Sequence, residues 1–387
     1  MYKIQTLNNI SVRGLERFPR DRYELASELP SPHAIMLRSY KMHDMNIPTS
    51  VLAVGRAGAG VNNIPVDKLS ARGIPVFNAP GANANAVKEL VIAGMLMASR
   101  NLLPAWDFAR KVEGDDATID KAVESGKKDF AGFEIAGRTL GVIGLGAIGR
   151  LVANTAIDLG MKVVGFDPGL TVQGAWKLSS DVAQAHSVDE LFSRVDFVSI
   201  HVPLTDGTRK LVNADRLRLM RKGGVILNFS RGGIVDDVAV CQSIDSGHLH
   251  AYVCDFPANA LKNRSRVIAL PHLGASTEEA EDNCAVMVAD QLRDYLENGN
   301  IINAVNFPEV SMPRSEGFRV AIANRNVPNM VGQISTKLAT AGCNIIDMLN
   351  KSKGELAYTL VDVNQPISES LLKDLRSIDG ILAVRVC

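Results

Sequence analysis

One stretch, from Thr139 to Asp167, constrains the fold of this chain more than any other. It contains Gly144-Leu-Gly-Ala-Ile-Gly149, which follows an apolar, strand-like run at 140–143 and opens a helix-like run at 150–159. A second apolar run, 162–166, ends at Asp167. Strand, glycine-rich turn, helix and second strand with a terminal acid form the βαβ unit that binds dinucleotides.

Each position of this unit has a physical role. Gly144 permits the tight turn, Gly146 lets the backbone approach a pyrophosphate, and Gly149 lets helix and strand pack closely. The helix start presents unpaired N–H groups and a partial positive charge to the phosphates. The carboxylate of Asp167 would accept from both ribose hydroxyls and repel a 2′-phosphate, which favours NAD over NADP.

Bulk properties narrow the class of protein. The chain has 387 residues, 46% of them hydrophobic, and a formal net charge of zero. This predicts two or three globular domains and no general attraction to nucleic acid or to a membrane surface. No apolar run is long enough to span a membrane, and the first residues lack a signal-peptide core. Five scattered cysteines without C-x-x-C argue against disulfides or zinc and fit a reducing cytoplasm.

Periodicity along the chain divides it into three predicted domains. Residues 1–94 read as an α/β domain that a long helix at 277–298 returns to cover, so that 277–305 completes it. Residues 95–276 alternate strands and helices around the glycine-rich turn, as a Rossmann domain does. Residues 317–387 read as strand, helix, strand, strand, helix, strand, the ferredoxin-like order, and we expect them to fold independently.

Four polar residues follow strand-like runs of the predicted Rossmann domain: Asp167, Arg231, Asp255 and His272. The carboxyl ends of parallel strands form the ligand-binding edge of such a sheet. An arginine there can bind a carboxylate bidentately and polarise a forming carbonyl. A histidine there can take and return the hydroxyl proton of a 2-hydroxy acid. No histidine, cysteine or carboxylate spacing suggests a metal site.

The first domain carries a second glycine-rich turn, Gly55-Arg-Ala-Gly-Ala-Gly60, after a strand-like run. Its glycine spacing differs from the dinucleotide motif, and the next strand ends in Asn78 rather than an acid. Backbone N–H groups with the guanidinium of Arg56 suit an oxyanion such as phosphate or carboxylate. The alternative is a bare tight turn with a solvated arginine. Arg38-Ser39 follows the preceding strand and would lie at the same edge.

Four motifs together resemble the D-isomer-specific 2-hydroxyacid dehydrogenases. They are Gly144-Leu-Gly-Ala-Ile-Gly149, His201-Val-Pro-Leu-Thr205, Asn228-Phe-Ser-Arg-Gly-Gly233 and Pro271-His-Leu-Gly-Ala-Ser-Thr277. Gly55-Arg-Ala-Gly-Ala-Gly-Val-Asn62 and the small C-terminal domain are similar to members that oxidise 3-phosphoglycerate, the first step of the phosphorylated serine pathway. The resemblance implies a flavodoxin-like substrate domain, a Rossmann NAD-binding domain, a ferredoxin-like ACT domain and a homodimer or homotetramer.

The resemblance also implies roles for individual residues. Arg231 would bind the substrate carboxylate and His272 would be the acid/base, while Asp255 would hold the nicotinamide carboxamide. The implied cofactor-binding residues are Gly144, Gly146, Ala147, Ile148, Gly149, Asp167, His201, Val202, Pro203, Phe229, Ser230, Asp255, Gly274 and Ala275. The implied substrate-binding residues are Arg38, Ser39, Arg56, Ala57, Gly58 and Asn78.

Two departures from the family pattern matter. The family has a glutamate, paired with the catalytic histidine, a few residues after the position of Asp255, whereas 256–271 contain no carboxylate. Asn259, Asp255 or an acid from elsewhere would then have to orient His272. In the ACT-like domain, Asn326 and Asn344 match residues that bind serine as an effector, but Asn324 and Asn329 replace a common histidine and glycine. The domain would therefore bind L-serine, or serve only in oligomer assembly.

Two other functions fit parts of the pattern. A dehydrogenase that acts on an unphosphorylated acid, such as glyoxylate or lactate, would keep the NAD site, Arg231 and His272. An NAD-sensing corepressor would keep the dinucleotide site but would have no use for the arginine-bearing turns at Arg38 and Arg56. Oxidation of 3-phosphoglycerate with NAD uses all of these features, and it is the function that we expect.

Overall fold

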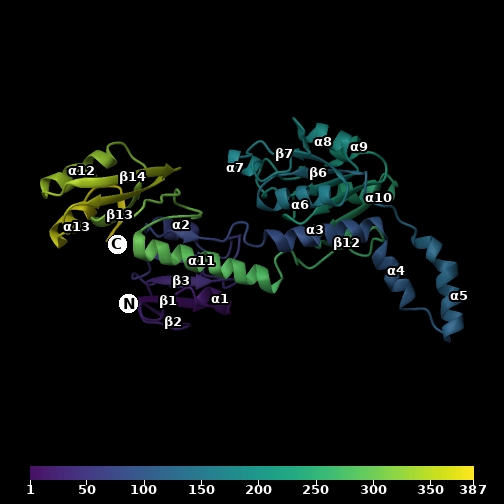
Figure 1. Cartoon of the computed structure of the whole chain (residues 1–387), viewed down its shortest axis with the longest axis horizontal. Coiled ribbons are helices and arrows are strands. Elements are labelled where there is room, and N and C mark those ends of the chain that lie inside the picture. The colour runs from purple at the N-terminus through teal and green to yellow at the C-terminus, as the bar shows by residue number, and fades with distance from the viewer. The chain divides into compact units, whose positions relative to one another are not determined.

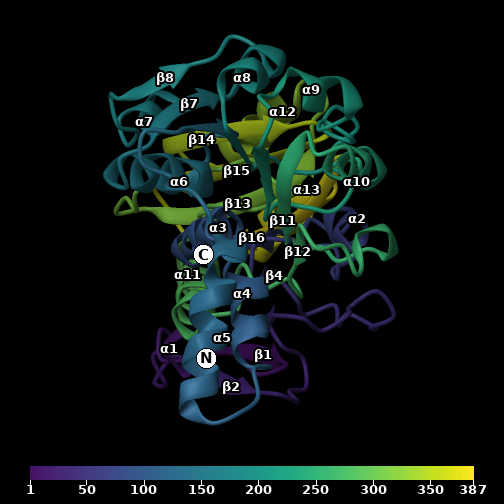
Figure 2. The ribbon, with the colours of Figure 1, turned by 90° about the vertical axis from the view of Figure 1, so that its right-hand side faces the viewer.

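The computed structural model describes residues 1–387, which form two compact units (Figures 1 and 2). The first unit consists of 1–83 and 278–387, and the second of 84–277. The boundary after residue 83 precedes the one expected after residue 94, because helix α3 (Ala84–Ser99) packs Val91 and Met95 into the core of the second unit. No helix is both long enough and apolar enough to cross a bilayer.

The first unit is built on a five-stranded parallel sheet of order β2-β1-β3-β4-β5. This is the flavodoxin-like order that the fold prediction requires. Short apolar runs form the central strands, and all four residues of β3 are buried. The elements are β1 (Tyr2–Leu7), α1 (Val12–Leu15), β2 (Tyr23–Ala26), β3 (Ala34–Leu37), β4 (Ala53–Arg56), α2 (Val66–Ser70), β5 (Val76–Phe77) and α11 (Glu278–Asn298).

Helix α11 packs along one face of this sheet, as the sequence predicts. Its contact with β4 is close because Gly55 has no side chain: a Cβ there would lie 2.5 Å from Cγ1 of Val288 and 2.9 Å from Cδ1 of Leu292. Both leucine and valine are fully buried in the core of the first unit. The glycine that opens the predicted oxyanion turn therefore also sets the distance between helix and strand.

The second unit is a seven-stranded parallel sheet of order β12-β11-β10-β9-β6-β7-β8, the Rossmann order with one strand added. Its strands are apolar on both faces because helices cover both sides. The elements are β6 (Thr139–Ile143), α6 (Ala147–Asp158), β7 (Lys162–Phe166), α7 (Val172–Ala175), β8 (Val182–Gln184), α8 (Val188–Arg194), β9 (Phe197–Ile200), α9 (Ala214–Leu219), β10 (Gly224–Asn228), α10 (Asp237–Asp245), β11 (Leu249–Cys254), η2 (Asn259–Leu261) and β12 (Val267–Ala269).

A helical arm leaves the second unit after α3. It consists of α4 (Leu102–Ala109), α5 (Asp116–Gly126) and η1 (Lys127–Phe130). Figures 1 and 2 show α4 and α5 projecting from the sheet of that unit, and neither helix has a buried residue. Leu102, Leu103 and Trp106 are exposed on α4. The arm therefore presents apolar side chains that the chain itself does not cover.

A separate four-stranded antiparallel sheet forms the C-terminal part of the first unit. Its order, β14-β15-β13-β16, with two helices, is the ferredoxin-like arrangement expected from the sequence. Both helices pack on one face of the sheet. The elements are β13 (Phe318–Arg325), α12 (Met330–Thr340), β14 (Ile345–Lys353), β15 (Leu356–Val363), α13 (Glu369–Arg376) and β16 (Ile381–Val386).

The two faces of this small sheet have different partners within the first unit. Along β13, Val320 and Ile322 face α12 and α13, whereas Ala321 and Ala323 belong to the same apolar core as Tyr295 of α11. The alternation follows from the two-residue period of a strand. The sequence predicts an independently folded domain, but the structure buries one face of its sheet against the end of α11. The three-domain division stays a prediction.

Candidate active site

The glycine-rich turn of the second unit has the geometry that a dinucleotide requires. Gly144 has φ +88°, and a Cβ there would lie 2.5 Å from the carbonyl oxygen of His201. A Cβ at Gly149 would lie 1.9 Å from the carbonyl oxygen of Gly144, so only glycine lets α6 pack on β6. Nothing lies within 4 Å of a Cβ at Gly146, which precedes Ala147 at the start of α6. This open space at a helix N-terminus is where a pyrophosphate would bind.

Asp167 directly follows β7, beside this turn. Its Oδ2 accepts the backbone N–H of Leu145 and its Oδ1 accepts that of Gly169, each at 2.8 Å. Each carboxylate oxygen has a further lone pair, so both remain able to accept a ribose hydroxyl. The sequence predicted an acid at this strand end, but not the hydrogen bond by which it holds the glycine-rich turn in place.

His201 directly follows β9 (Phe197–Ile200), and its carbonyl lies beside the glycine-rich turn. Its ring Nε2 lies 2.8 Å from Oγ of Ser199, and its backbone N–H donates to the carbonyl of Ile143 at 2.7 Å. Burial lowers the pKa of His201 to about 3, so the ring is neutral at physiological pH. A neutral ring packed against the turn fits a wall of the cofactor site, as the sequence proposes, rather than an acid/base. Val202 and Pro203 continue this wall, and Oγ of Ser230 donates to the carbonyl of Val202 at 2.5 Å.

Arg231 lies in a turn that a buried asparagine holds. Asn228, the last residue of β10, donates from Nδ2 to the carbonyl of Arg231 at 3.0 Å and accepts the N–H of Ser230 at 3.2 Å. Phe229 between them is buried, while the Arg231 side chain is exposed and donates to the carbonyl of Ser230 at 2.7 Å. Sequence reasoning missed Asn228 as a positioning residue, although a polar residue closing an apolar strand is the signal for it.

Asp255 brings the ends of β11 and β12 together. Its Oδ2 accepts the N–H of Gly274 at 3.2 Å, and its backbone carbonyl accepts the N–H of His272 at 3.0 Å. Burial raises the pKa of Asp255, while the Gly274 N–H and the charges of His272 and Arg231 oppose that rise. Asp255, His272, Arg231 and Gly274 therefore lie near one another in the second unit, with Ala275 next in the same turn.

One atom of this group has no partner. Asp255 is only 1% exposed, and its buried Oδ1 accepts no hydrogen bond within the protein. A buried carboxylate oxygen without a donor is costly. A carboxamide NH₂ would satisfy it, which is the role that the sequence assigns to Asp255. This atom, the open space beside Gly146 and the acceptors of Asp167 together fit NAD.

His272 has an aromatic neighbour in place of an acidic one. Its ring packs on Phe256 with centroids 4.9 Å apart, and its backbone adopts φ +48°. No carboxylate oxygen lies within 4.0 Å of the ring, and neither Asn259 nor the Asp255 side chain is hydrogen-bonded to it. The ring contacts Phe256, and which group orients His272 stays a prediction.

The predicted substrate-binding residues lie together in the first unit. Arg56, at the end of β4, donates from Nε to the carbonyl of Arg38 at 2.9 Å and from Nη1 to that of Gly60 at 2.5 Å. A Cβ at Gly58 would lie 2.7 Å from Nη1 of Arg56, so glycine makes room for the guanidinium. Arg38 pairs through Nη2 with Oε1 of Glu281 at 2.5 Å. The sequence did not predict this acidic partner.

The other residues of this group shape the same loops. The N–H of Ala57 donates to the carbonyl of Leu37 at 2.7 Å, and Nδ2 of Asn78 donates to the carbonyl of Ala59 at 2.5 Å. Ser39 is exposed. Two arginines are thus held on neighbouring loops at the carboxyl edge of the first sheet. An incoming oxyanion would compete with Glu281 for Arg38.

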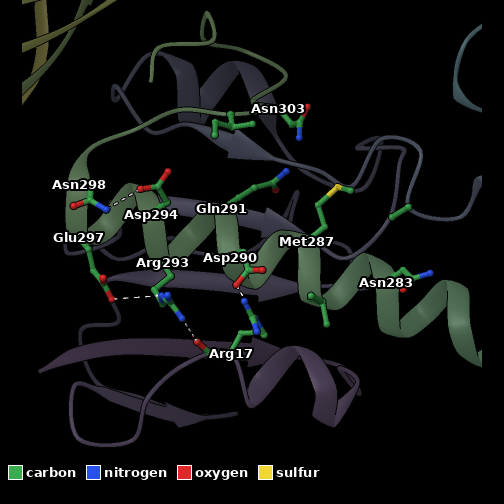
Figure 3. A pocket seen from close by; sticks show the side chains of 13 residues that line it. Arg17, Asn283, Met287, Asp290, Gln291, Arg293, Asp294, Glu297, Asn298 and Asn303 are labelled. Atoms are coloured by element: carbon green, nitrogen blue, oxygen red, sulfur yellow. Dashed lines mark hydrogen bonds and ion pairs between the residues drawn. The ribbon is translucent and has the colours of Figure 1, made fainter. Parts of the chain in front are cut away.

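A hollow along α11 in the first unit contains none of these residues. It measures about 750 Å³ and runs along α11, as Figure 3 shows. Four of its charged side chains form ion pairs, Arg17 with Asp290 at 2.8 Å and Arg293 with Glu297 at 3.7 Å, while Asp294 accepts from Asn298 and Asn300. This hollow therefore does not coincide with the predicted active site. The structure contains no cluster of side chains suited to a metal ion.

Of the two predicted effector residues, only one lines a cavity. Asn326 borders a hollow of about 170 Å³ at the start of α12, together with Asn324, Asn329 and Asn350. Oδ1 of Asn324 is buried without a partner. Asn344 lies outside this cavity, is exposed, and donates its backbone N–H to Oδ1 of Asn364 at 2.8 Å.

Known proteins are similar to this chain in both sequence and fold. A family model described as D-isomer specific 2-hydroxyacid dehydrogenase, NAD binding domain, matches residues 92–274. A D-3-phosphoglycerate dehydrogenase from Haemophilus influenzae is 32% identical over 400 residues, covering 99% of this chain and 94% of that protein. One from Escherichia coli K12 is 31% identical over 382 residues, covering 95% and 89%.

Solved structures agree at the level of the fold. D-mandelate dehydrogenase from Rhodotorula graminis superposes with a TM-score of 0.67 at 22% identity, covering 81% of this chain and 99% of that chain. An NAD⁺-bound 3-phosphoglycerate dehydrogenase from Entamoeba histolytica gives 0.59 at 24%, covering 79% and 98%. The chain belongs to the D-isomer-specific 2-hydroxyacid dehydrogenase family and is an NAD-dependent oxidoreductase. Within that family, the relatives that match it along nearly its whole length are D-3-phosphoglycerate dehydrogenases.

Proposed function

We propose that this enzyme oxidises 3-phospho-D-glycerate to 3-phosphohydroxypyruvate with NAD, opening the phosphorylated route to L-serine. The likeness to D-3-phosphoglycerate dehydrogenases over nearly the whole chain supports the substrate. The observation that carries the proposal is the pair of arginine-bearing loops in the first unit, where Arg56 bridges the carbonyls of Arg38 and Gly60. A substrate with a phosphate as well as a carboxylate needs more cationic donors than Arg231 alone supplies.

The chemistry divides between two groups of residues. Bound NAD accepts the hydride. Arg231 would bind the substrate carboxylate and polarise the carbonyl that forms at C2, and His272 would take the hydroxyl proton. Asp255 would accept from the nicotinamide carboxamide through its unpartnered Oδ1. Arg38 and Arg56, with Ser39, Ala57, Gly58 and Asn78, would hold the phosphate end.

The absence of a paired glutamate changes how His272 works. Its ring is held by Phe256 and by its own left-handed backbone, and no carboxylate stabilises the imidazolium. We propose that this enzyme performs proton transfer with an unpaired histidine. Phe256→Ala should then lower kcat while leaving NAD affinity nearly unchanged, because the ring loses its support. A kcat equal to wild type would show that Phe256 does not orient the base.

A direct assay tests the substrate. NAD reduction should be followed with 3-phosphoglycerate, D-lactate and glycolate, and the phosphorylated acid should have the highest kcat/KM. Arg56→Ala should reduce kcat/KM for 3-phosphoglycerate much more than for D-lactate, with Arg218→Ala, on the exposed surface of α9, as the control. Equal losses would remove the phosphate role from Arg56. If none of these acids gives NADH, the result would instead favour an NAD-sensing binding protein.

We also propose that the small domain binds L-serine. A cavity of about 170 Å³ at the start of α12, lined by Asn326 and containing the unpartnered Oδ1 of Asn324, supports an amino-acid ligand with a donor for that oxygen. Asn344 lies outside this cavity, so in our proposal it acts on a serine held against a second copy. Calorimetry should show L-serine binding that weakens in Asn326→Ala and Asn344→Ala. Asn350→Asp adds a negative charge to the cavity with almost no change of shape, so it tests the effect of charge alone. No binding at millimolar serine would leave the domain as an assembly module.

We further propose a homo-oligomer in which the second units pair through the helical arm. The support is the set of exposed apolar side chains on α4, Leu102, Leu103 and Trp106, of which only Trp106 has a ring contact within the chain, with Arg110 at 4.6 Å. Trp106→Glu should shift sedimentation toward the monomer, because it places a charge in the contact. Glu113→Lys, beyond the end of α4, provides a charge-changing control. An unchanged sedimentation coefficient for Trp106→Glu would exclude the arm from the interface.

A further inference from the structure

A second hollow in the first unit combines buried positive charge with an absence of acids. It measures about 150 Å³ and lies between two loops of the parallel sheet, the last turn of α11 and one face of the small sheet. It is lined by Thr49, Val51, Leu52, Arg72, Gly73, Ile74, Tyr295, Ala321, Ala323, Tyr358, Ala383, Val384 and Arg385. Two arginines line it, and no aspartate or glutamate does.

Arg385 approaches the hollow from β16 of the small sheet. Its Nη1 donates to the carbonyl of Leu296 at 3.1 Å, Nη2 donates to that of Tyr295, and its Cζ lies 4.2 Å from the centroid of the Tyr295 ring. Its Nε is buried and has no partner. No carboxylate oxygen lies within 4.0 Å of the guanidinium. The negative end of α11 and the aromatic ring offset part of the charge, but one donor is left unmet.

Arg72 approaches the same hollow from the loop before β5. Its guanidinium donates to the carbonyls of Ile47 at 3.0 Å and Pro48 at 2.7 Å, and it forms no ion pair. Thr49 follows these two residues and adds a hydroxyl to the lining. Cationic side chains in a cavity are normally matched by an anion, because removing a charge from water is costly. Here the protein supplies two cations and no anion.

We propose that this hollow binds a small oxyanion of the phosphate type. The donors would be Nε of Arg385, the guanidinium of Arg72 and the hydroxyl of Thr49. Its volume equals that of about five water molecules, which suits a tetrahedral ion with few further atoms. The site is separate from the loops of Arg38 and Arg56 and from the asparagine-lined cavity at α12, and it does not rest on the proposed reaction.

The position of the hollow gives the anion a structural consequence. Arg72 and Thr49 belong to the parallel-sheet part of the first unit, whereas Arg385 and Ala383 belong to β16 of the small sheet. An ion held by both parts would fasten the small sheet to the end of α11. Free phosphate and the phosphate group of a short phosphorylated acid offer the same chemistry, so the source is a matter for the experiment.

Thermal unfolding of the full chain tests the proposal. At constant ionic strength, replacing chloride with inorganic phosphate should raise Tm once its concentration exceeds the dissociation constant, and then by about 2–4 °C for each further tenfold increase. Phosphate will also meet the cofactor and substrate loops, so variants identify the site. Arg72→Gln removes one cation, and Ala383→Leu fills the hollow while keeping both arginines. Arg218→Gln, an exposed arginine of α9, is the matched control.

The expected result is a phosphate-dependent Tm shift that falls by at least half in Arg72→Gln and Ala383→Leu and is retained in Arg218→Gln. The same shift in all four proteins would overturn the proposal. If Ala383→Leu does not fold, Thr49→Val removes one donor with little change of shape and should weaken the shift in the same direction. Glycerol 3-phosphate distinguishes the sources: a larger Tm shift than inorganic phosphate gives at the same concentration indicates a phosphorylated small molecule, and a smaller one indicates free phosphate.

Discussion

At the scale of single residues, the polar groups at the strand ends of the second unit are supported by side chains from neighbouring segments. Asp167, Arg231, Asp255 and His272 all follow strands of the second unit, because the order of apolar runs and turns fixes those positions. Their supports involve contacts that no local pattern encodes. Asn228 holds the turn of Arg231, and Phe256 contacts the ring of His272. These supports could not be predicted because they depend on packing between segments.

The dual role of Asp167 gives a prediction for the cofactor. Asp167→Ala removes the acceptor for the ribose hydroxyls and the charge that would repel a 2′-phosphate, and it releases the N–H groups of Leu145 and Gly169. NAD should bind more weakly by roughly 2–3 kcal/mol, and discrimination against NADP should shrink. Fluorescence titration with both dinucleotides measures this, with Asp181→Ala as an exposed control. A wild-type preference for NADP would contradict the role given to Asp167.

Burial of His201 predicts a dependence of stability on pH. Folding lowers the pKa of this ring to about 3. At a pH below the ordinary pKa of histidine, the unfolded chain therefore binds the proton more readily than the folded protein does. The contribution is complete above about pH 6.5 and is lost as pH falls toward 3, with a slope of at most about 1.4 kcal/mol per unit. The residue keeps partial solvent exposure, which makes that slope an upper limit.

His201→Gln keeps a hydrogen-bonding side chain beside Ser199 but cannot titrate. Urea unfolding between pH 6.5 and 4.5 should therefore show a shallower loss of stability in the variant than in wild type. Other titrating groups act on both proteins, so the difference between the two curves isolates His201. Parallel curves would show that the ring is protonated as easily in the folded protein as in the unfolded chain.

At the scale of elements, the sequence predicted α11 almost to the residue but not its closeness to β4. An apolar stripe over 285–296 and a helix of this length follow directly from the 3.6-residue period. The approach of Val288 and Leu292 to Gly55 is a tertiary contact, invisible in either segment alone. The sequence suggested an oxyanion turn for the glycines at 55–60, whereas Gly55 itself serves helix packing.

Gly55→Ala should therefore destabilise the first unit. The added Cβ would lie 2.5 Å from Cγ1 of Val288, so α11 must shift away from β4. Overpacking of this kind typically costs about 1–3 kcal/mol of unfolding free energy. Because Arg56 is the next residue, KM for 3-phosphoglycerate should also rise. Gly207→Ala is the control, since its nearest neighbour would lie 3.9 Å away. Two variants of equal stability would contradict the close packing.

At the scale of the whole molecule, the order of elements predicted all three sheets, including the βαββαβ order of the small one. What the sequence did not reveal is that the small sheet has two buried faces. Alternation along β13 hides this, because alanines at 321 and 323 look neutral beside Val320 and Ile322. Arg319 gave no sign that it would be buried, yet its five N–H donors are used on Asp362 and on the carbonyls of Asn298, Met312 and Pro313.

The last prediction concerns removal of the small domain. Three of its side chains bind carbonyls at the end of α11 and just beyond: Arg385 binds those of Tyr295 and Leu296, Arg319 that of Asn298, and Tyr358 that of Gly299. Deleting the residues after Ser315 would leave these acceptors to water and expose apolar surface of Tyr295 and Phe307. At about 1 kcal/mol for each lost hydrogen bond, the first unit should lose several kcal/mol of unfolding free energy.

Urea unfolding of the truncated and full chains measures that loss, and Tyr358→Phe provides a point variant that should account for about 1 kcal/mol of it. The truncated enzyme keeps Arg231, His272 and the NAD site, so it should reduce NAD but lose activity at a lower temperature. An unfolding midpoint equal to that of the full chain would mean that the small sheet does not stabilise α11. In that case the domain would behave as the independent module that the sequence alone predicts.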